Sequence, residues 1–253
     1  MPELVWYAAY GSNLLWDRFR TYLEGGPVPH RPTPTIQAGA RDPSPPRGDG
    51  RWTFEHELFF AGSSPGWGGG GVAFLHPEPP RPEPPRPGPL QPGSPPPAHQ
   101  DAAATLGRRW LVTAEQFEDV FRQENGITVP GSDAHPGSGP GHRIDAGDGP
   151  LFDLDTVEPG GFIDAGPRWY GRVLHLGHGP DGNPVATFTG PDPYRHQRAP
   201  APIAYLRTVG LGLLETWDLG PAEVAARLVA CEGNRGAVDV DEVTADLEQW
   251  SAR

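Results

Sequence analysis

The sequence predicts a mixed α/β fold, organised as one domain spanning residues 1–253 with two long inserted loops. Short apolar runs that are typical of buried strands alternate with helix-like repeats along the chain, which favours a sheet packed by helices. These patterns lie on both sides of a proline-rich stretch, so the two halves are expected to complete a single core. The chain is 36% hydrophobic and contains 8 Trp, which is enough to build such a core.

The N-terminal part predicts a strand, a turn and a helix. Leu4 to Tyr10 is almost wholly apolar, as in a strand that is buried on both faces. A Gly-Ser-Asn turn follows at 11–13. Apolar residues then recur at helical spacing until two glycines end the pattern; they are Leu15, Phe19, Tyr22 and Leu23, followed by Gly25 and Gly26.

The remaining elements are read from the same two kinds of pattern. Strands are expected within residues 53–62, 70–75, 106–112 and 168–177. Helices are expected over Thr113 to Glu124, Pro202 to Trp217, Pro221 to Cys231 and Asp241 to Trp250.

Two segments are predicted to be insertions. Residues 77–101 form a proline-rich loop with 12 prolines between Pro77 and Pro97, typical of a polyproline-II spacer. The same stretch could dock a protein partner weakly through a groove of the SH3 or WW kind. Residues 130–166 are rich in Gly and Asp and are interpreted as a second long loop, with a possible role as a lid.

Composition excludes several classes of partner and chemistry. The formal charge of −12 does not favour electrostatic binding to nucleic acid or to anionic membranes. All 20 basic residues are Arg, so Schiff-base chemistry and a phosphate-binding lysine are excluded. The single cysteine, Cys231, allows neither an internal disulfide nor a Cys-cluster zinc site. No signal peptide or membrane span is indicated, so we expect a soluble cytoplasmic protein. We also expect no cofactor and no metal, because no motif for either is found.

The helix predicted at Thr113 carries the first candidate for chemistry, Glu124. Thr113 and Gln116 form a capping box, and Asn125-Gly126 is a stop signal. Glu124 lies on the stripe of core residues Phe117, Val120 and Phe121, whereas the charged residues Glu115, Glu118, Asp119 and Arg122 are expected to lie mostly away from it. A carboxylate on an apolar stripe either pairs with an arginine or faces a cavity, where it could act as a general base.

The N-terminal turn is the complementary candidate. A buried strand that runs into a turn and a helix gathers unpaired backbone N–H groups, a site where an anion can bind. Gly11 permits a close approach or an unusual φ, and Ser12 or Asn13 could cap the helix. A purely structural turn without a ligand is the alternative.

Other motifs fail on physical grounds. Residues 62–66 match the sequence pattern of a nucleophile elbow, but Pro65, which follows the serine, has no N–H to donate to an oxyanion. His175 and His178 are not expected to share a face and so to form a metal pair. No nucleotide-binding motif follows a strand.

With Tyr-Gly-Ser-Asn-Leu after an N-terminal strand and a helix ending in Gln-Glu-Asn-Gly, the chain resembles the γ-glutamylcyclotransferase-like family. The resemblance extends to "GGVAFL", to Tyr170 in "RWYGRVLHLG" and to the C-terminal helical segment "APAPIAYLRTVGLGLLE". It implies a small mixed β-barrel packed by helices. It covers nearly all residues outside the two insertions.

The resemblance also implies a reaction and a site. The loop at Tyr10, Gly11, Ser12, Asn13 and Leu14 would hold the α-carboxylate of a γ-glutamyl substrate, a small molecule or a peptide, while Gly70, Gly71 and Tyr170 would line the cavity. Glu124 would move protons while the substrate's α-amine attacks its own γ-carbonyl, releasing an amine and 5-oxoproline. The leaving amine stays open, and so does the alternative of a non-catalytic, regulatory relative that binds small molecules in the same cavity.

Overall fold

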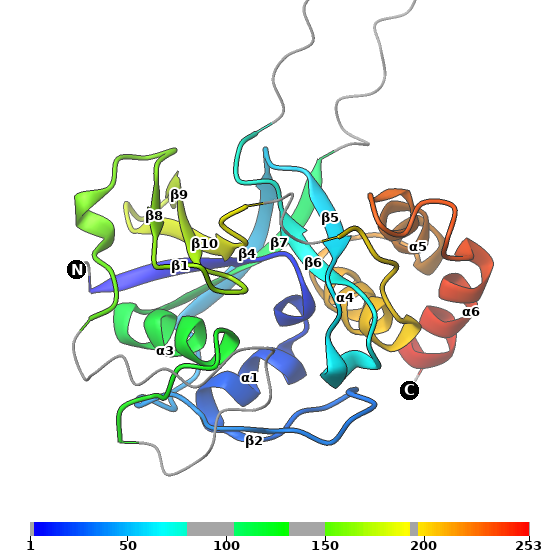
Figure 1. The fold of residues 1–253 in the computed structure, drawn as a ribbon, viewed down its shortest axis with the longest axis horizontal. Coiled ribbons are helices and arrows are strands. Elements are labelled where there is room, and N and C mark those ends of the chain that lie inside the picture. Colours follow the sequence, from blue (N-terminus) through cyan, green and yellow to red (C-terminus); the bar gives the residue numbers. More distant parts are fainter. Residues whose placement is uncertain (1–2, 80–103, 132–149, 193–196, 253) are drawn as a thin grey trace, which may run out of the picture.

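The computed structural model describes residues 3–79, 104–131, 150–192 and 197–252, and its central feature is a six-stranded sheet (Figure 1). The strand order is β4-β7-β1-β10-β9-β8. β1 pairs with β10 in parallel, and the other neighbours are antiparallel. The strands are β1 (Leu4–Ala9), β4 (Gly48–Phe54), β7 (Thr105–Thr113), β8 (Phe162–Asp164), β9 (Arg172–His178) and β10 (Pro184–Thr189).

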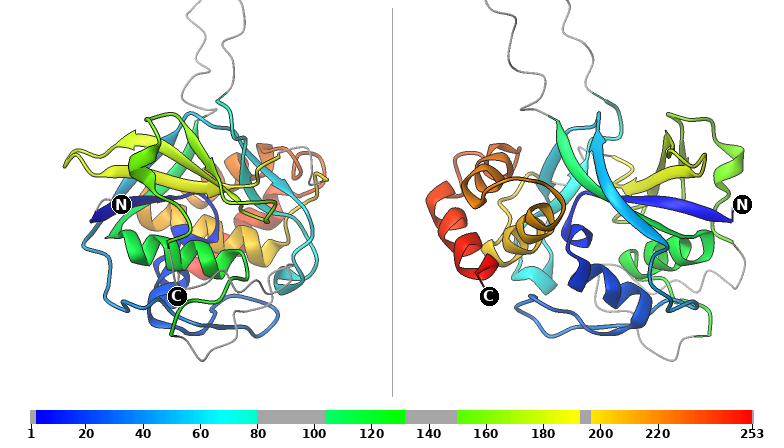
Figure 2. Two further views of the ribbon diagram at one scale, coloured as in Figure 1. Left: turned by 60° about the vertical axis from the view of Figure 1, so that its left-hand side comes forward. Right: turned by 180° about the vertical axis from the view of Figure 1, so that it is seen from behind.

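Helices lie beside the sheet in two groups. Helices α1 (Trp16–Glu24) and α3 (Ala114–Glu124) pack on one side of it, whereas α4 (Ile203–Thr216), α5 (Pro221–Ala230) and α6 (Val240–Ser251) form a separate group (Figures 1 and 2). This second group adjoins a two-stranded hairpin of β5 (Leu58–Ala61) and β6 (Val72–Leu75). A smaller hairpin, β2 (Gly26–Pro27) and β3 (Ile36–Gln37), follows α1.

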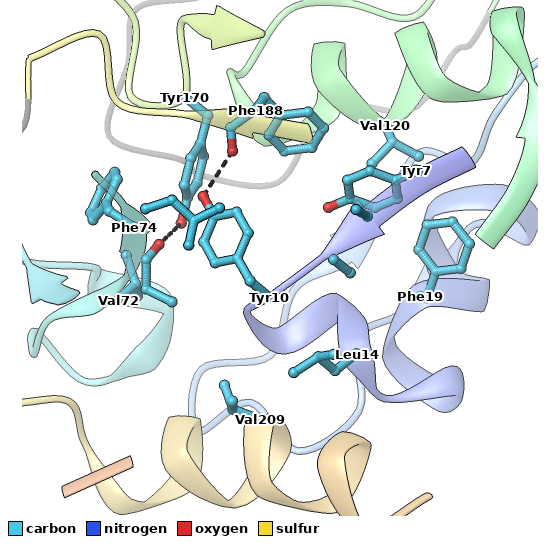
Figure 3. Packing of buried hydrophobic residues seen from close by; sticks show 14 of the residues in the cluster. Tyr7, Tyr10, Leu14, Phe19, Val72, Phe74, Val120, Tyr170, Phe188 and Val209 are labelled. Atoms are coloured by element: carbon cyan, nitrogen blue, oxygen red, sulfur yellow. Dashed lines mark hydrogen bonds between the residues drawn. The ribbon is translucent and has the colours of Figure 1, made fainter. Parts of the chain in front are cut away.

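The core forms around β1, whose residues Val5 to Ala9 are all buried. Such two-sided burial explains the nearly continuous apolar run in this part of the sequence. Aromatic rings fill the space between β1, β10 and α3. Tyr7 stacks on Phe188 at 5.1 Å between ring centroids (Figure 3). Tyr7 also contacts Phe117 at 5.7 Å between ring centroids.

The mixed α/β class predicted from the sequence is confirmed, but the closed barrel is not found. In the described part of the chain, the six-stranded sheet is open, with β4 and β8 at its edges. The β5–β6 hairpin forms a sheet of its own, linked by single bridges to Arg198 and Glu232 rather than to the edge strands. With no ladder between the hairpin and an edge strand, a barrel cannot close.

Several local predictions need correction. Residues 53–62 belong to two strands, β4 and β5, with a bend between them. Strand β10 was not predicted, although it is the parallel partner of β1. The predicted loop at 130–166 is only partly irregular, because its described part contains a 3₁₀ turn, Leu154–Thr156, and strand β8. Phe152 from this segment packs on Phe121 at 5.1 Å between ring centroids.

Helix α3 has the predicted ends, but its polar face is not in solvent. Thr113 and Gln116 form the capping box. Arg122 donates to Glu118 at 2.8 Å, and both side chains are buried. Asp119 is also buried and accepts from Arg41 at 3.0 Å. Although they were expected only to lie away from the apolar stripe, these residues are buried because Arg41, which follows β3, and Thr128, which follows α3, contact this face.

The proline-rich loop predicted at 77–101 falls almost entirely outside the described residues. Division of the chain into domains stays a prediction. No helix among the described residues is long and apolar enough to span a membrane.

Candidate functional site

A small cavity opens between the N-terminal turn, the end of α3 and the β5–β6 hairpin. Its walls come from the 3₁₀ turn Ser12–Leu14, from α1 and α3, from the loop between β5 and β6, and from the segment before β9. The space that water centres can occupy inside it measures about 60 Å³. Because one water needs roughly 10–15 Å³ by this measure, the cavity has room for several waters or one closely fitted ligand group.

Glu124 is the one carboxylate among the described residues that line this cavity. Its Oε1 accepts a hydrogen bond from Nδ2 of Asn13 at 3.0 Å and another from the hydroxyl of Tyr22. No residue that the structure describes donates to Oε2. The carboxylate is therefore held in place through one oxygen, and the other is available to a ligand.

Asn13 is fixed by the protein at both ends. Its Nδ2 also donates to the hydroxyl of Tyr7 at 3.0 Å, and its backbone carbonyl accepts from Nε1 of Trp110 at 3.0 Å. Neither Ser12 nor Asn13 caps α1, contrary to the sequence prediction. Leu15 occupies the N-cap position without a side-chain bond, because the 3₁₀ turn separates the strand from the helix. Asn13 is thus freed to position Glu124.

Gly11 is required for a close approach rather than for a positive φ. Its φ is −110°, a value that other residues adopt readily. A Cβ at this position would lie 3.0 Å from the hydroxyl oxygen of Tyr205 and 3.4 Å from Cβ of Ala73. The backbone N–H groups of Gly11 and Asn13 have no hydrogen-bond acceptor among the described residues. The turn therefore has two backbone donors without an acceptor in the described part of the chain. That they bind an anion stays a prediction.

Two tyrosines named from the sequence form part of the wall. Tyr10 donates to the carbonyl of Phe188 at 2.8 Å, and Tyr170 donates to the carbonyl of Ala73 at 3.0 Å (Figure 3). Burial raises the pKa of both phenols well above the usual value. They stay protonated near neutral pH, so their role here is structural. Tyr10 joins the residue after β1 to β10, and Tyr170 joins the segment before β9 to β6.

Three residues named from the sequence do not line the cavity. Leu14 is fully buried against α4, where a Cβ at Gly212 would lie 2.4 Å from Cβ of Leu14. A Cβ at Gly70 would lie 2.4 Å from Pro202, and one at Gly71 would lie 2.2 Å from the carbonyl of Ala199. These glycines let the hairpin pack against the segment before α4. Val72, the next residue, reaches the cavity instead.

Two arginines that sequence reasoning missed also reach the cavity, Arg18 and Arg31. Arg18 is 2% exposed and donates to Oγ1 of Thr21 at 3.0 Å and to the hydroxyl of Tyr22. Arg31 comes from the connection between β2 and β3. The helical spacing of Arg18 and Tyr22 could have suggested that they meet, but no sequence pattern marks Arg31.

Metal ligands are not gathered at this site. Among the described residues, no group of three or more His, Cys, Asp or Glu side chains could hold a metal ion. The rings of His175 and His178 lie 5.2 Å apart, but His175 is engaged by the carbonyls of Val157 and Gly177 at 2.7 and 3.1 Å.

Comparisons with known proteins show similarity to a plant protein in sequence and to a solved enzyme structure in fold coverage. No family model matches the chain. Histone deacetylase 5 of Arabidopsis thaliana is 33% identical over 239 residues, which cover 88% of this chain. The match spans only 30% of that protein's length, so the name of the whole protein does not describe the matched segment by itself.

The solved structure is a γ-glutamyl cyclotransferase. It shares 15% sequence identity with this chain, covers 98% of it and 99% of its own length, and superimposes with a TM-score of 0.43. The chain is thus similar over most of its length to one segment of a larger plant protein.

Proposed function

We propose that the chain is a cyclotransferase that cleaves a γ-glutamyl amide to 5-oxoproline and an amine. The observation that carries this proposal is the placement of Glu124, whose Oε1 is held by Asn13 at 3.0 Å and by Tyr22 while Oε2 has no partner among the described residues. The cavity is small, and the N–H groups of Gly11 and Asn13 lie in the turn that borders it. The Tyr-Gly-Ser-Asn-Leu and Gln-Glu-Asn-Gly motifs support the same reaction.

In this proposal the substrate's α-carboxylate binds the N–H groups of the turn. Glu124 accepts a proton from the α-amino group, whose lone pair then attacks the side-chain carbonyl carbon of the same glutamyl residue. A C–N bond forms within the new ring, and the original amide C–N bond breaks. Glu124 returns the proton to the departing nitrogen, and the extra proton on the ring nitrogen passes to the released amine, which leaves as an ammonium ion, so the reaction needs no other reactant.

Positioning supplies much of the rate enhancement in such a ring closure. A well-oriented intramolecular attack is worth roughly 7–11 kcal/mol of the barrier. In this proposal the aromatic walls of the cavity hold the glutamyl chain in a folded conformer. Glu124 itself cannot drift, because Asn13 and Tyr22 both bind the same oxygen.

The test is release of 5-oxoproline from a panel of γ-glutamyl amides by the purified full chain. We expect Glu124→Gln to abolish release while the thermal unfolding curve stays close to that of the wild type. Glu115→Gln is the matched control, since it removes a carboxylate from the half-exposed start of the same helix. Full activity in the Glu124 variant, or no turnover of any amide by the wild type, would contradict the proposal.

The non-catalytic alternative keeps the same cavity but predicts ligand binding without turnover. Its expected partner-docking loop lies outside the described residues, so no observation favours it over the enzyme. Binding of a γ-glutamyl amide to the wild type with no 5-oxoproline formed would favour this alternative.

A further inference from the structure

Arg18 is a buried cation that is linked to Glu124 through the hydroxyl of Tyr22. Arg18 and Tyr22 lie four positions apart on α1, so their side chains share one face of the helix. Nη2 of Arg18 donates to the hydroxyl of Tyr22, and Cζ of Arg18 lies 4.1 Å from the centroid of the Tyr22 ring. The same hydroxyl donates to Oε1 of Glu124. The three side chains therefore form a hydrogen-bonded series that runs from a guanidinium to a carboxylate.

No carboxylate pairs with Arg18 directly within the described part of the chain. The residue is 2% exposed, its Nη1 donates to Oγ1 of Thr21 at 3.0 Å, and its Nε is buried without an acceptor. A buried charge without a partner is costly. The contact through Tyr22 thus gives the guanidinium a route by which it stabilises the negative charge of Glu124.

The same contact fixes the direction in which the Tyr22 hydroxyl points its proton. A guanidinium carries donors and no acceptor, so the oxygen of Tyr22 must accept from Arg18. Burial is the largest cause that raises the pKa of Tyr22 well above its usual value, so the hydroxyl keeps its proton near neutral pH. That proton has one hydrogen-bond acceptor among the described residues, Oε1 of Glu124.

Oε1 of Glu124 is thereby occupied by two donors. Nδ2 of Asn13 donates to it at 3.0 Å, and the hydroxyl of Tyr22 donates to it as well. A proton placed on Oε1 would have to displace one of these donors, whereas no residue that the structure describes donates to Oε2. Oε2 is therefore the oxygen that can gain and lose a proton without breaking a hydrogen bond of the protein.

Other titratable or charged groups also face Glu124 from the surrounding elements. They are Tyr7 on β1, Tyr10 after it, Arg31 in the connection from β2 to β3, Tyr170 before β9 and Tyr205 on α4. Burial raises the pKa of the four tyrosines, so they are neutral near pH 7. Arg31 makes no hydrogen bond with any described residue. Arg18 differs from all of these groups because it is a cation that acts on Glu124 through a hydrogen-bonded series.

We infer that Arg18 is a positioning residue: by donating to Tyr22 it keeps the Tyr22 hydroxyl as a donor to Oε1 of Glu124, so that Oε2 is the oxygen that accepts and returns the proton. The role of Oε2 in turnover rests on the proposed function, whereas the hydrogen-bonded series is a property of the resting protein. Loss of the series should make Glu124 easier to protonate, because hydrogen bonds from Tyr22 and the charge of Arg18 stabilise the ionised carboxylate.

The experiment follows the side-chain carboxyl carbon of Glu124 by carbon-13 NMR during an acid titration of the full chain. The resonance is assigned by its loss in Glu124→Gln. We expect the titration midpoint to rise by about one to two pH units in Tyr22→Phe, and by about one unit in Arg18→Met. The double variant should shift by less than the sum, because Arg18 acts through the hydroxyl that Tyr22→Phe removes. Arg20→Met, on the exposed face of α1, is the matched control and should leave the midpoint unchanged.

A conservative variant separates this role from one in packing. Arg18→Lys keeps a charge and a donor, so its midpoint should lie closer to that of the wild type than to that of Tyr22→Phe. It also makes a smaller change to the core, so it keeps the test available if Arg18→Met does not fold. A Lys midpoint as high as that of Tyr22→Phe, an unchanged midpoint in Arg18→Met, or fully additive shifts in the double variant would overturn the inference.

Turnover gives a second measurement. Arg18→Met should lower kcat for 5-oxoproline release by about tenfold or more and leave KM nearly unchanged, because Arg18 acts on Glu124 and not on the bound molecule. A raised KM with an unchanged kcat would show direct ligand binding by Arg18 and would also overturn the inference. Because the NMR titration is read without turnover, an absence of 5-oxoproline release by the wild type would count against the proposed reaction alone.

Discussion

Nδ2 of Asn13 lies 3.0 Å from Oε1 of Glu124, so an amide in the N-terminal turn holds a carboxylate from the end of α3. The two residues are 111 positions apart in the chain. The same amide nitrogen also donates to the hydroxyl of Tyr7 at 3.0 Å. This contact joins the two halves of the candidate site, and its disruption should affect catalysis more than folding.

Asn13→Asp tests this contact with little change in size. A second carboxylate at this distance favours the protonated form of the pair, so the acid limb of the pH–rate profile should move to higher pH. Loss of a hydrogen bond to a charged group costs about 1.5–3 kcal/mol, so kcat/KM should fall about ten- to a hundredfold. The measurement is 5-oxoproline release across pH. Asn13→Ala is the control that removes the donor without adding charge, and an Asp variant with an unshifted acid limb would refute the contact's role.

Gly11→Ala tests the close approach between the turn and Tyr205. The added Cβ would meet the hydroxyl oxygen of Tyr205 at 3.0 Å, so we expect a loss of about 1–3 kcal/mol in the free energy of unfolding. Tyr205→Phe removes that oxygen, and the double variant should lose less stability than the sum of the two single variants. Denaturant titrations of all four proteins measure this coupling. Strictly additive losses would show that Tyr205 is not the obstacle.

Gly212→Ala tests the packing of α4 on the N-terminal turn. The new methyl group would lie 2.4 Å from Cβ of Leu14 and 2.5 Å from its backbone carbonyl carbon, and backbone cannot move aside cheaply. We expect destabilisation of about 3 kcal/mol or more, measured by denaturant unfolding. Gly50→Ala is the matched control, since its Cβ would meet Arg109 at an ordinary 3.6 Å. Similar stability of the two variants would contradict the packing described here.

Alkaline pH should destabilise the fold through its buried tyrosines. Burial raises the pKa of Tyr7, Tyr10, Tyr22 and Tyr170 well above the usual value. The folded chain therefore keeps protons that the unfolded chain releases, and stability should fall as pH rises through about 10, the usual tyrosine pKa. Denaturant midpoints across this range measure the fall, and Tyr22→Phe should make it shallower. Midpoints that do not change with pH would contradict these shifts.

The single cysteine should resist alkylation. Burial raises the pKa of the Cys231 thiol to about 11. Since the thiolate is the reacting form, iodoacetamide should label the folded chain far more slowly near neutral pH than the urea-unfolded chain, where the thiol regains its usual pKa of about 8.5. Mass spectrometry of timed samples measures both rates. Equal rates would show that the thiol is accessible and unshifted in the folded state.

The sequence predicted much of the local structure and part of the site. The capping box at Thr113 and Gln116 and the apolar stripe that ends at Glu124 act over a few residues, so both could be predicted. The prediction that Ser12 or Asn13 caps α1 was wrong. The local sequence is compatible both with a 3₁₀ turn and with a turn that leads directly into a helix, so it does not distinguish the two. Strand β10 was missed because its parallel partner β1 lies far away in the chain.

By itself, the sequence determined where most helices and strands lie, that β1 is buried, and that Glu124 and the turn at Gly11 are candidates for chemistry. These features follow from the spacing of apolar residues and from helix-start and helix-stop signals, which are local. Only the tertiary structure decided that Asn13 and Tyr22 share one oxygen of Glu124, that Gly70 and Gly71 serve packing, and that Arg31 reaches the cavity. Those facts depend on contacts between distant segments, which the hydrophobic pattern brings together without specifying which polar side chains meet.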